Sequence, residues 1–329
     1  MISIRDDNLV FRFPDVHQDA VLSIDFQRTL RIPDDDAVHF LPPGLGSFPL
    51  RNVDDFAGTV PAKWREHGGV MLPMFQSEAL WINFGWQSDY PFLVKIAAGS
   101  INAVTGKTWN DAVTPKPQNY VVTGEQPWLD GFCVKKGEIR QFVAMPLGSG
   151  YSAEEQITGR ADVGGLQLVV YPMKAEAWEK LKADQGQSLG VEMRICCFRE
   201  ASPDMGLAPG GRMRQEIFDD PYDFDVWDLE HPCRCFVHIA NSLSWRAITG
   251  QAPPTLPPTA KQYTEAGLPW FDWYDESATA LEGSGTLADL KSVKQMGQQK
   301  GQHPLPENEP VGKVKLKPLG PGQVREWAP

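Results

Sequence analysis

The sequence predicts an α+β protein in which strands dominate, arranged as antiparallel or mixed sheets with a few short helices and a Pro- and Gly-rich C-terminal arm. Three observations support this. Short segments that are typical of strands recur as far as Ala240, and turn residues separate them. The helix-forming runs are brief. Prolines cluster directly after residue 252. A sandwich of two sheets is one arrangement that the pattern allows.

The N-terminal third is expected to be built from short strands. In LVFRF, VLSIDF and TLRI, apolar and polar residues alternate, as in a half-buried strand. The clusters 33–36 and 42–46 are expected to supply turns between extended segments. Residues 62–67 are expected to form a helical turn, and residues 92–97 another strand. The clearest hairpin lies in GFCVKKGEIRQFVAMPL, because Gly137 can adopt the positive φ of a short loop.

The middle of the chain mixes both element types. Ser152 and Glu155 match the Ser-x-x-Glu capping box of a helix start. The run GLQLVVYPMK is continuously apolar, which is typical of a strand covered on both faces. The remaining expectations for this part are a helix at 175–183, a strand at 190–199, a loop at 202–211, a strand at CFVHIA and a helix at 242–248.

A proline cluster marks the best boundary in the chain. Pro253, Pro254, Pro257 and Pro258 predict a rigid connector between a β-rich main body, residues 1–252, and a C-terminal region, residues 253–329. That region is expected to hold helices at 259–266 and from Thr286 to Met296. Its KVKLK segment is typical of a lysine-guarded edge strand.

Charge is unevenly distributed along the 329 residues. The net charge is −11, which disfavours nucleic acid as a partner. Residues 291–329, however, carry seven basic against three acidic side chains, so this tail is +4 and the rest of the chain −15. Coulomb attraction favours a tail that lies against its own acidic body, and binding of RNA is the less favoured alternative.

Targeting signals and spans are not visible in the sequence. No basic region followed by an apolar run opens the chain, and no stretch is apolar enough to cross a membrane. The five cysteines are expected to be reduced thiols. We therefore expect a cytoplasmic protein with no membrane span, and we predict no cofactor.

The segment HPCRCFVH contains weak candidates for metal ligands, namely His231, Cys233 and Cys235. On a strand, Cys233 and Cys235 share one face and His238 lies on the other. Structural zinc sites usually combine a close cysteine pair with a second, distant pair. Buried thiols beside a half-buried histidine are therefore the favoured interpretation, and no metal is predicted.

The pairing of tryptophan with nearby aspartate is the least ordinary feature of the sequence, which has 11 Trp in all. Aromatic faces stack on sugar rings, and carboxylates accept hydroxyl protons or act as acid and base. Core packing is the ordinary interpretation of a Trp, and capping that of an Asp. The candidate catalytic carboxylates are Asp130, Asp272, Asp275 and Glu276, and the candidate ligand-binding aromatics are Trp128, Trp270, Trp273 and Tyr274.

Two segments could hold an anion, and neither matches a nucleotide-binding pattern. The loop 148–152 precedes a helix start, but Glu154 and Glu155 already place negative charge there. Arg212 and Arg214 could grip a carboxylate or phosphate. A solvated face paired with the acidic segment 218–225 is the more common arrangement, and that segment could also bind Ca²⁺ weakly. The hydrolase patterns G-x-S-x-G and HExxH are absent.

Several segments resemble a family of uncharacterised bacterial and fungal proteins that often carry the automatic label "integral membrane protein". They are FQRTLRIPDDD, LPPGLG, GEQPWLDGFCVKKGEIRQFVAMPLGSGYSAEEQITG, GGLQLVVYPMK, WRAITG, GLPWFDWY, LPENE and PGQVRE, which together span most of the chain. The resemblance implies no activity, cofactor or catalytic residue. Its label conflicts with the lack of an apolar span in this sequence.

These features favour a binding or assembly protein over an enzyme. A Pro- and Gly-rich basic arm is suited to docking on its own body or on a neighbouring subunit, which predicts self-association. The alternative is a carbohydrate-active hydrolase that uses paired carboxylates beside Trp platforms, with a glycan or another small molecule as its ligand.

Overall fold

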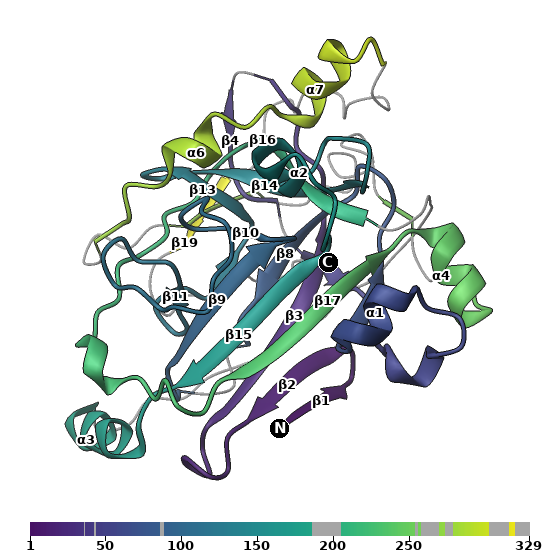
Figure 1. The fold of residues 1–329 in the computed structure, drawn as a ribbon. Coiled ribbons are helices and arrows are strands. Elements are labelled where there is room, and N and C mark those ends of the chain that lie inside the picture. Colours follow the sequence, from purple (N-terminus) through teal and green to yellow (C-terminus); the bar gives the residue numbers. More distant parts are fainter. Residues whose placement is uncertain are drawn as a thin grey trace.

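The computed structural model describes residues 1–35, 37–42, 44–85, 89–185, 205–253, 256–257, 270–273, 279–302 and 316–319 (Figure 1). At 184–185, 270–273 and 316–319 the description is of the backbone alone. The strand-dominated α+β class predicted from the sequence is confirmed. Most of the sheet is antiparallel, and the described helices are short.

The strands begin with an N-terminal group and continue through the central sheet to a small separate pair. Their bounds are β1 Ile2–Arg5, β2 Asn8–Arg12, β3 Val21–Thr29, β4 Val38–His39, β5 Gly44–Ser47, β6 Arg51–Asn52, β7 Val70–Pro73, β8 Ala79–Asn83, β9 Phe92–Ala98, β10 Ile101–Asn102, β11 Val121–Val122, β12 Trp128–Leu129, β13 Gly131–Lys135, β14 Glu138–Pro146, β15 Leu166–Pro172, β16 Met205–Arg214, β17 Cys233–Ala240, β18 Trp270–Trp273 and β19 Leu316–Leu319.

The helices lie around the sheet in Figure 1, with α1 beside α4 at one side and α6 and α7 together at another. Their bounds are α1 Ala62–His67, α2 Ala153–Thr158, α3 Ala175–Gln185, α4 Ser242–Thr249, α6 Gly285–Ala288 and α7 Val293–Gln299, with 3₁₀ turns at Asp54–Phe56 and Phe224–Val226.

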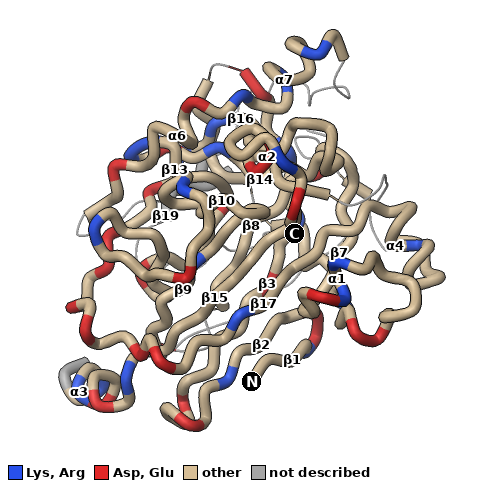
Figure 2. Tube along the Cα trace, viewed as in Figure 1, with Lys and Arg blue, Asp and Glu red and all other residues tan. Residues whose placement is uncertain are grey.

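Two antiparallel groups of strands form the centre of the molecule. In one, β15 pairs with β9 on one side and with β17 on the other. In the other, β8 pairs with β3 and β14, and β14 with β16. One large cluster of buried hydrophobic side chains draws members from both groups. Figure 2 shows charged residues mainly on turns and edges, and β15 carries none.

Several elements follow the sequence expectations closely. The hairpin joins β13 to β14 around Gly137, whose φ is +70°. Every residue of β15 is buried, as a strand covered on both faces requires. The capping box at Ser152 starts α2. The helix predicted at 242–248 is α4, and Gly250 ends it in the left-handed conformation.

Four expectations were wrong. The cluster 42–46, expected to be a turn, includes the start of β5, because Gly44–Ser47 pair with β3. TLRI is not a strand of its own, since β3 ends at Thr29. Residues 205–211 belong to strand β16 rather than to a loop, because Gly210 and Gly211 allow neighbouring segments to approach closely. A Cβ on Gly210 would lie 2.5 Å from Val143 Cγ2. The single helix expected from Thr286 to Met296 is instead two helices, since Ser284 caps α6 and Ser292 caps α7. The elements expected at 190–199 and 259–266 lie outside the described residues, as does most of KVKLK.

Residues 279–302 of the C-terminal region lie on the main body. Ala280 forms a β-bridge with Phe218, and α6 packs against β13. Leu287 is fully buried in the core. Farther along, the Lys294 backbone N–H donates to Asp34 Oδ2 at 2.8 Å, and Lys300 Nζ donates to the Ser149 carbonyl at 2.7 Å. This part of the region is therefore tied to the body by apolar and polar contacts.

Within the described ranges, no helix has both the length and the apolar character needed to cross a membrane.

Candidate functional site

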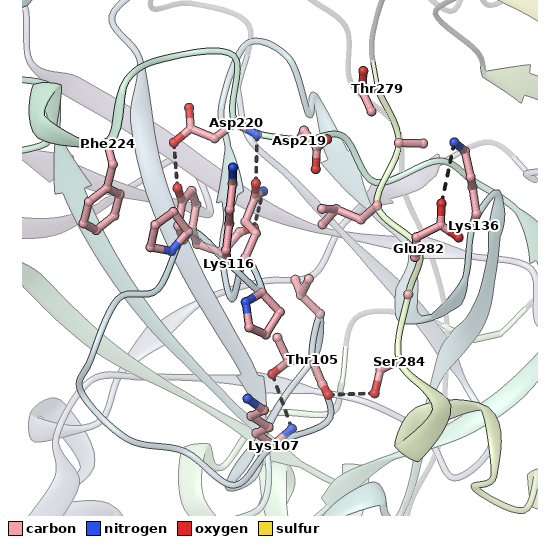
Figure 3. Close-up of a pocket in the computed structure, with 18 of the residues that line it drawn as sticks. Thr105, Lys107, Lys116, Lys136, Asp219, Asp220, Phe224, Thr279, Glu282 and Ser284 are labelled. Carbon is pink, nitrogen blue, oxygen red and sulfur yellow. Dashed lines mark hydrogen bonds and ion pairs between the residues drawn. The ribbon is translucent and has the colours of Figure 1, made fainter.

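A cleft of about 900 Å³ opens beside the C-terminal segment (Figure 3). Three parts of the chain that are distant in sequence line it: the loops 104–107 and 115–120 that follow β10, the loop 219–224 that follows β16, and the segment 279–284 that precedes α6. Lys136, in the β13–β14 turn, completes the lining. The volume falls in the range of small-molecule sites, roughly 300 to 1,000 Å³.

Hydrogen bonds on both sides fix the segment 279–284 as one wall of this cleft. The Asp219 N–H donates to the Thr279 carbonyl at 2.7 Å, and the Leu281 N–H to the Ile217 carbonyl at 2.6 Å. At the other end, Ser284 Oγ donates to the Thr105 carbonyl at 2.6 Å. The cleft therefore depends on the docking of the C-terminal segment.

Aromatic rings and one carboxylate organise the opposite wall. Asp220 accepts hydrogen bonds from the Tyr120 hydroxyl at 2.7 Å and from Trp227 Nε1 at 2.8 Å, which holds the loop 219–224 in place. The rings of Tyr120 and Phe224 lie 6.4 Å apart, and Phe224 is half-buried. Burial raises the pKa of Tyr222 to about 12, so its phenol stays a hydrogen-bond donor at neutral pH.

The charges around the cleft nearly balance, with three lysines against four carboxylates. Only one pair of them is in contact, Lys136 Nζ with Glu282 Oε1 at 3.9 Å. Within the described part of the chain, no carboxylate lies at ion-pair distance from Lys107 or Lys116. Charged groups of both signs are thus available to a ligand, and the balance favours neither a strong anion nor a strong cation.

The structure buries the two predicted glycan-site residues that it describes in full. Trp128 is 1% exposed and Asp130 is 0% exposed. Gln215 binds Asp130 twice, since its Nε2 donates to the carboxylate at 2.9 Å and its Oε1 accepts from the Asp130 N–H at 3.0 Å. A sugar needs an accessible aromatic face, which Trp128 does not offer in this conformation.

Of the other predicted glycan-site residues, the structure describes only the backbone of those in 270–273. Trp270, Asp272 and Trp273 belong to β18, whose backbone pairs in parallel with β19. Tyr274, Asp275 and Glu276 lie outside the described residues.

The metal-ligand candidates do not converge on one point. His231 is exposed, and its Nδ1 lies 2.7 Å from Asp228 Oδ2, which raises the pKa of the imidazole. Cys235 is buried in β17, and burial raises the pKa of its thiol to about 12. Metals bind the thiolate and the neutral imidazole, so both shifts oppose ligation. Among the described side chains, no group of three or more His, Cys, Asp or Glu is placed to hold a metal.

Sequence reasoning missed a polar row that runs across three strands beside Trp128. Asp25 of β3 pairs with Asn83 of β8, and Asn83 pairs with Trp128 of β12, so the three side chains share one face. Asp25 Oδ2 accepts from Asn83 Nδ2 at 2.7 Å, and burial raises the pKa of this carboxyl. Its other donors, Gln27 and Ser47, are neutral. The row therefore does not form the carboxylate pair of a glycosidase.

The cleft residues were missed because they come from separate loops. The one local signal was the acidic and aromatic segment 218–225, which the sequence associates with an ion-paired face or Ca²⁺. No protein-family model, curated protein or solved structure matches this chain. The cleft geometry is therefore the basis of the functional proposal.

Proposed function

We propose that this chain is a small-molecule-binding protein whose C-terminal segment docks on its own body and completes the ligand cleft. The observation that carries the proposal is the wall formed by residues 279–284, which hydrogen-bond to Asp219 on one side and Thr105 on the other. Self-association through the rest of the arm and a cytoplasmic location remain predictions.

The chemistry of the lining favours a neutral, hydroxyl-rich ligand such as a saccharide of one or two rings. Half-buried Phe224 and Tyr222 offer apolar faces of the kind that pack on sugar rings. Asp219 and Asp223 can accept from hydroxyl groups, while Lys107 and Lys116 can donate to them. Because the opposite charges nearly cancel, a polyanion or polycation would gain little here.

The hydrolase alternative receives less support from the described residues. Asp130 is enclosed and held by Gln215, so it has no access to a substrate in this conformation. Binding without bond cleavage is therefore the form of the glycan hypothesis that we favour, and catalysis by the carboxylates of 272–276 stays a prediction.

Saturation-transfer NMR on the full-length protein tests the proposal, with glucose, galactose, mannose, N-acetylglucosamine, maltose and cellobiose as probes. We expect transfer to at least one sugar, and loss of that transfer in Phe224→Ala and in Asp223→Asn. Asp225→Asn is the matched control, since Asp225 follows Phe224 in the same 3₁₀ turn but does not line this cleft. Absence of transfer from every sugar, or its persistence in both cleft variants, would overturn the proposal.

A further inference from the structure

A second cleft, of about 540 Å³, lies between β14 and β16 on one side and the α6–α7 region on the other. Figure 1 places these elements together, away from α1 and α4. Its charged lining consists of Arg140, Arg212, Lys291 and Asp289, and Gln298 adds an amide. Positive charge therefore predominates among the side chains that face this cleft.

The two arginines lie directly opposite each other in the sheet. Arg140 of β14 and Arg212 of β16 are Cα partners in the antiparallel register. Like charges at such positions destabilise a strand pair, so the arrangement calls for a compensating negative charge.

The nearby carboxylates are already engaged by other groups. Glu138, two residues before Arg140, binds Lys135 Nζ at 2.8 Å and lies 3.7 Å from Arg212 Nε. Asp34 accepts from the Lys294 N–H at 2.8 Å. Both attract Arg140 at longer range, but neither forms an ion pair with it. The compensation that the described residues supply to Arg140 is thus incomplete.

Arg140 is 6% exposed, and its guanidinium makes no hydrogen bond to any described residue. A guanidinium has five N–H donors. The Arg140 nitrogens are not among the fully enclosed polar atoms that lack a partner, so these donors open to the cleft. Arg28, the other deeply buried arginine of the sheet, contacts the carboxylate of Glu78 instead. The difference is that Arg28 is fully enclosed, whereas Arg140 lines a cleft that a ligand can enter.

We propose that this second cleft binds an oxyanion, a phosphate or carboxylate group, on the guanidinium groups of Arg140 and Arg212. Planar guanidinium forks suit both kinds of anion, and a charge-assisted hydrogen bond is about twice as strong as a neutral one. Lys291 contributes positive charge at the α6–α7 side. The carboxylate of Asp289 offsets part of the positive charge and so disfavours ligands with several negative charges.

Isothermal titration calorimetry with inorganic phosphate and with acetate, at constant ionic strength, tests this site in the full-length protein. We expect one of the two to bind, and we expect Arg140→Met to weaken that binding about tenfold or more. Arg246→Gln is the control, because Arg246 is an exposed residue of α4. Binding of phosphate alone identifies a phosphate-bearing ligand, and binding of acetate alone a carboxylate-bearing one.

The unfolding midpoint separates a folding defect from loss of the site. Arg140→Met removes an unpaired buried charge, so without anion its midpoint should equal or exceed that of the unmodified protein. A folded Arg140→Met that keeps full anion affinity, or an unmodified protein that binds neither anion, overturns the proposal. Saccharide transfer in the same variants, measured without anion, reports on the first cleft, so failure of one proposal does not imply failure of the other.

Discussion

Replacing Leu287 by alanine measures how firmly the C-terminal segment is docked. Leu287 is fully buried, and α6 is a single turn from Gly285 to Ala288, too short to persist without packing. Truncating a buried leucine costs about 2 to 5 kcal/mol, depending on how far the cavity collapses. We expect the free energy of unfolding to fall by about that amount, and the saccharide affinity of the first cleft to fall with it.

Urea unfolding gives the free energy, and the rate of tryptic cleavage after Lys291 or Lys300 reports local release of the segment. Leu243→Ala is the matched control, because Leu243 is 65% exposed on α4 and its truncation should cost less than about 0.5 kcal/mol. A cost below about 1 kcal/mol for Leu287→Ala, with unchanged proteolysis, would refute the docking.

Three further predictions concern buried ionisable groups. Glu78→Gln should destabilise the fold by about 3 to 5 kcal/mol, because it leaves Arg28 buried without its partner. Arg28→Met combined with Glu78→Leu should cost much less. Chemical denaturation of the single and the double variant measures both costs. Burial lowers the pKa of His238 to about 4, below the value of about 6.5 in an unfolded chain, so the unfolded state takes up this proton first as the pH falls. The stability that neutral His238 contributes is therefore complete above about pH 6.5 and is lost toward pH 4. The free energy of unfolding should change over this range by at most about 1.4 kcal/mol per pH unit, and His238→Gln should flatten its measured pH dependence. Burial raises the pKa of Cys133 and of Cys235 to about 12, so iodoacetamide at pH 8 should label neither in the native protein, and peptide mass spectrometry showing either one labelled would contradict this.

The sequence was most informative where local chemistry decides the structure. Gly137 fixes the β13–β14 hairpin through its positive φ, and Ser152 starts α2 through its capping box. Strand β16 escaped prediction because Pro209 and the two glycines after it look like a turn in isolation. Its strand character comes from β14, against which those glycines pack closely. That information lies in a distant partner strand, where Pro209 pairs with Phe142, 67 residues earlier in the chain.

The candidate sites were harder to predict for the same reason. Tryptophan beside aspartate was a visible pattern, yet Trp128 and Asp130 are enclosed by neighbours that the sequence does not reveal. Arg212 was noted as a possible anion ligand, but its opposition to Arg140 depends on a register that shifts at an irregularity between Arg140 and Phe142. Pairing between strands that are distant in the sequence depends on tertiary packing, so no local pattern marks the opposition of Arg140 and Arg212.

The two proposed clefts share one structural element. Residues 279–284 form a wall of the first cleft, and residues 288–299 contribute to the second, with buried Leu287 and Val293 anchoring this stretch to the body. Release of the stretch would remove lining from both clefts together, so each proposed ligand would bind only the docked state. By linkage, a ligand in either cleft stabilises docking and thereby favours the other. The strength of the coupling depends on how often the stretch is released, because ligands cannot shift a segment that is already fully docked.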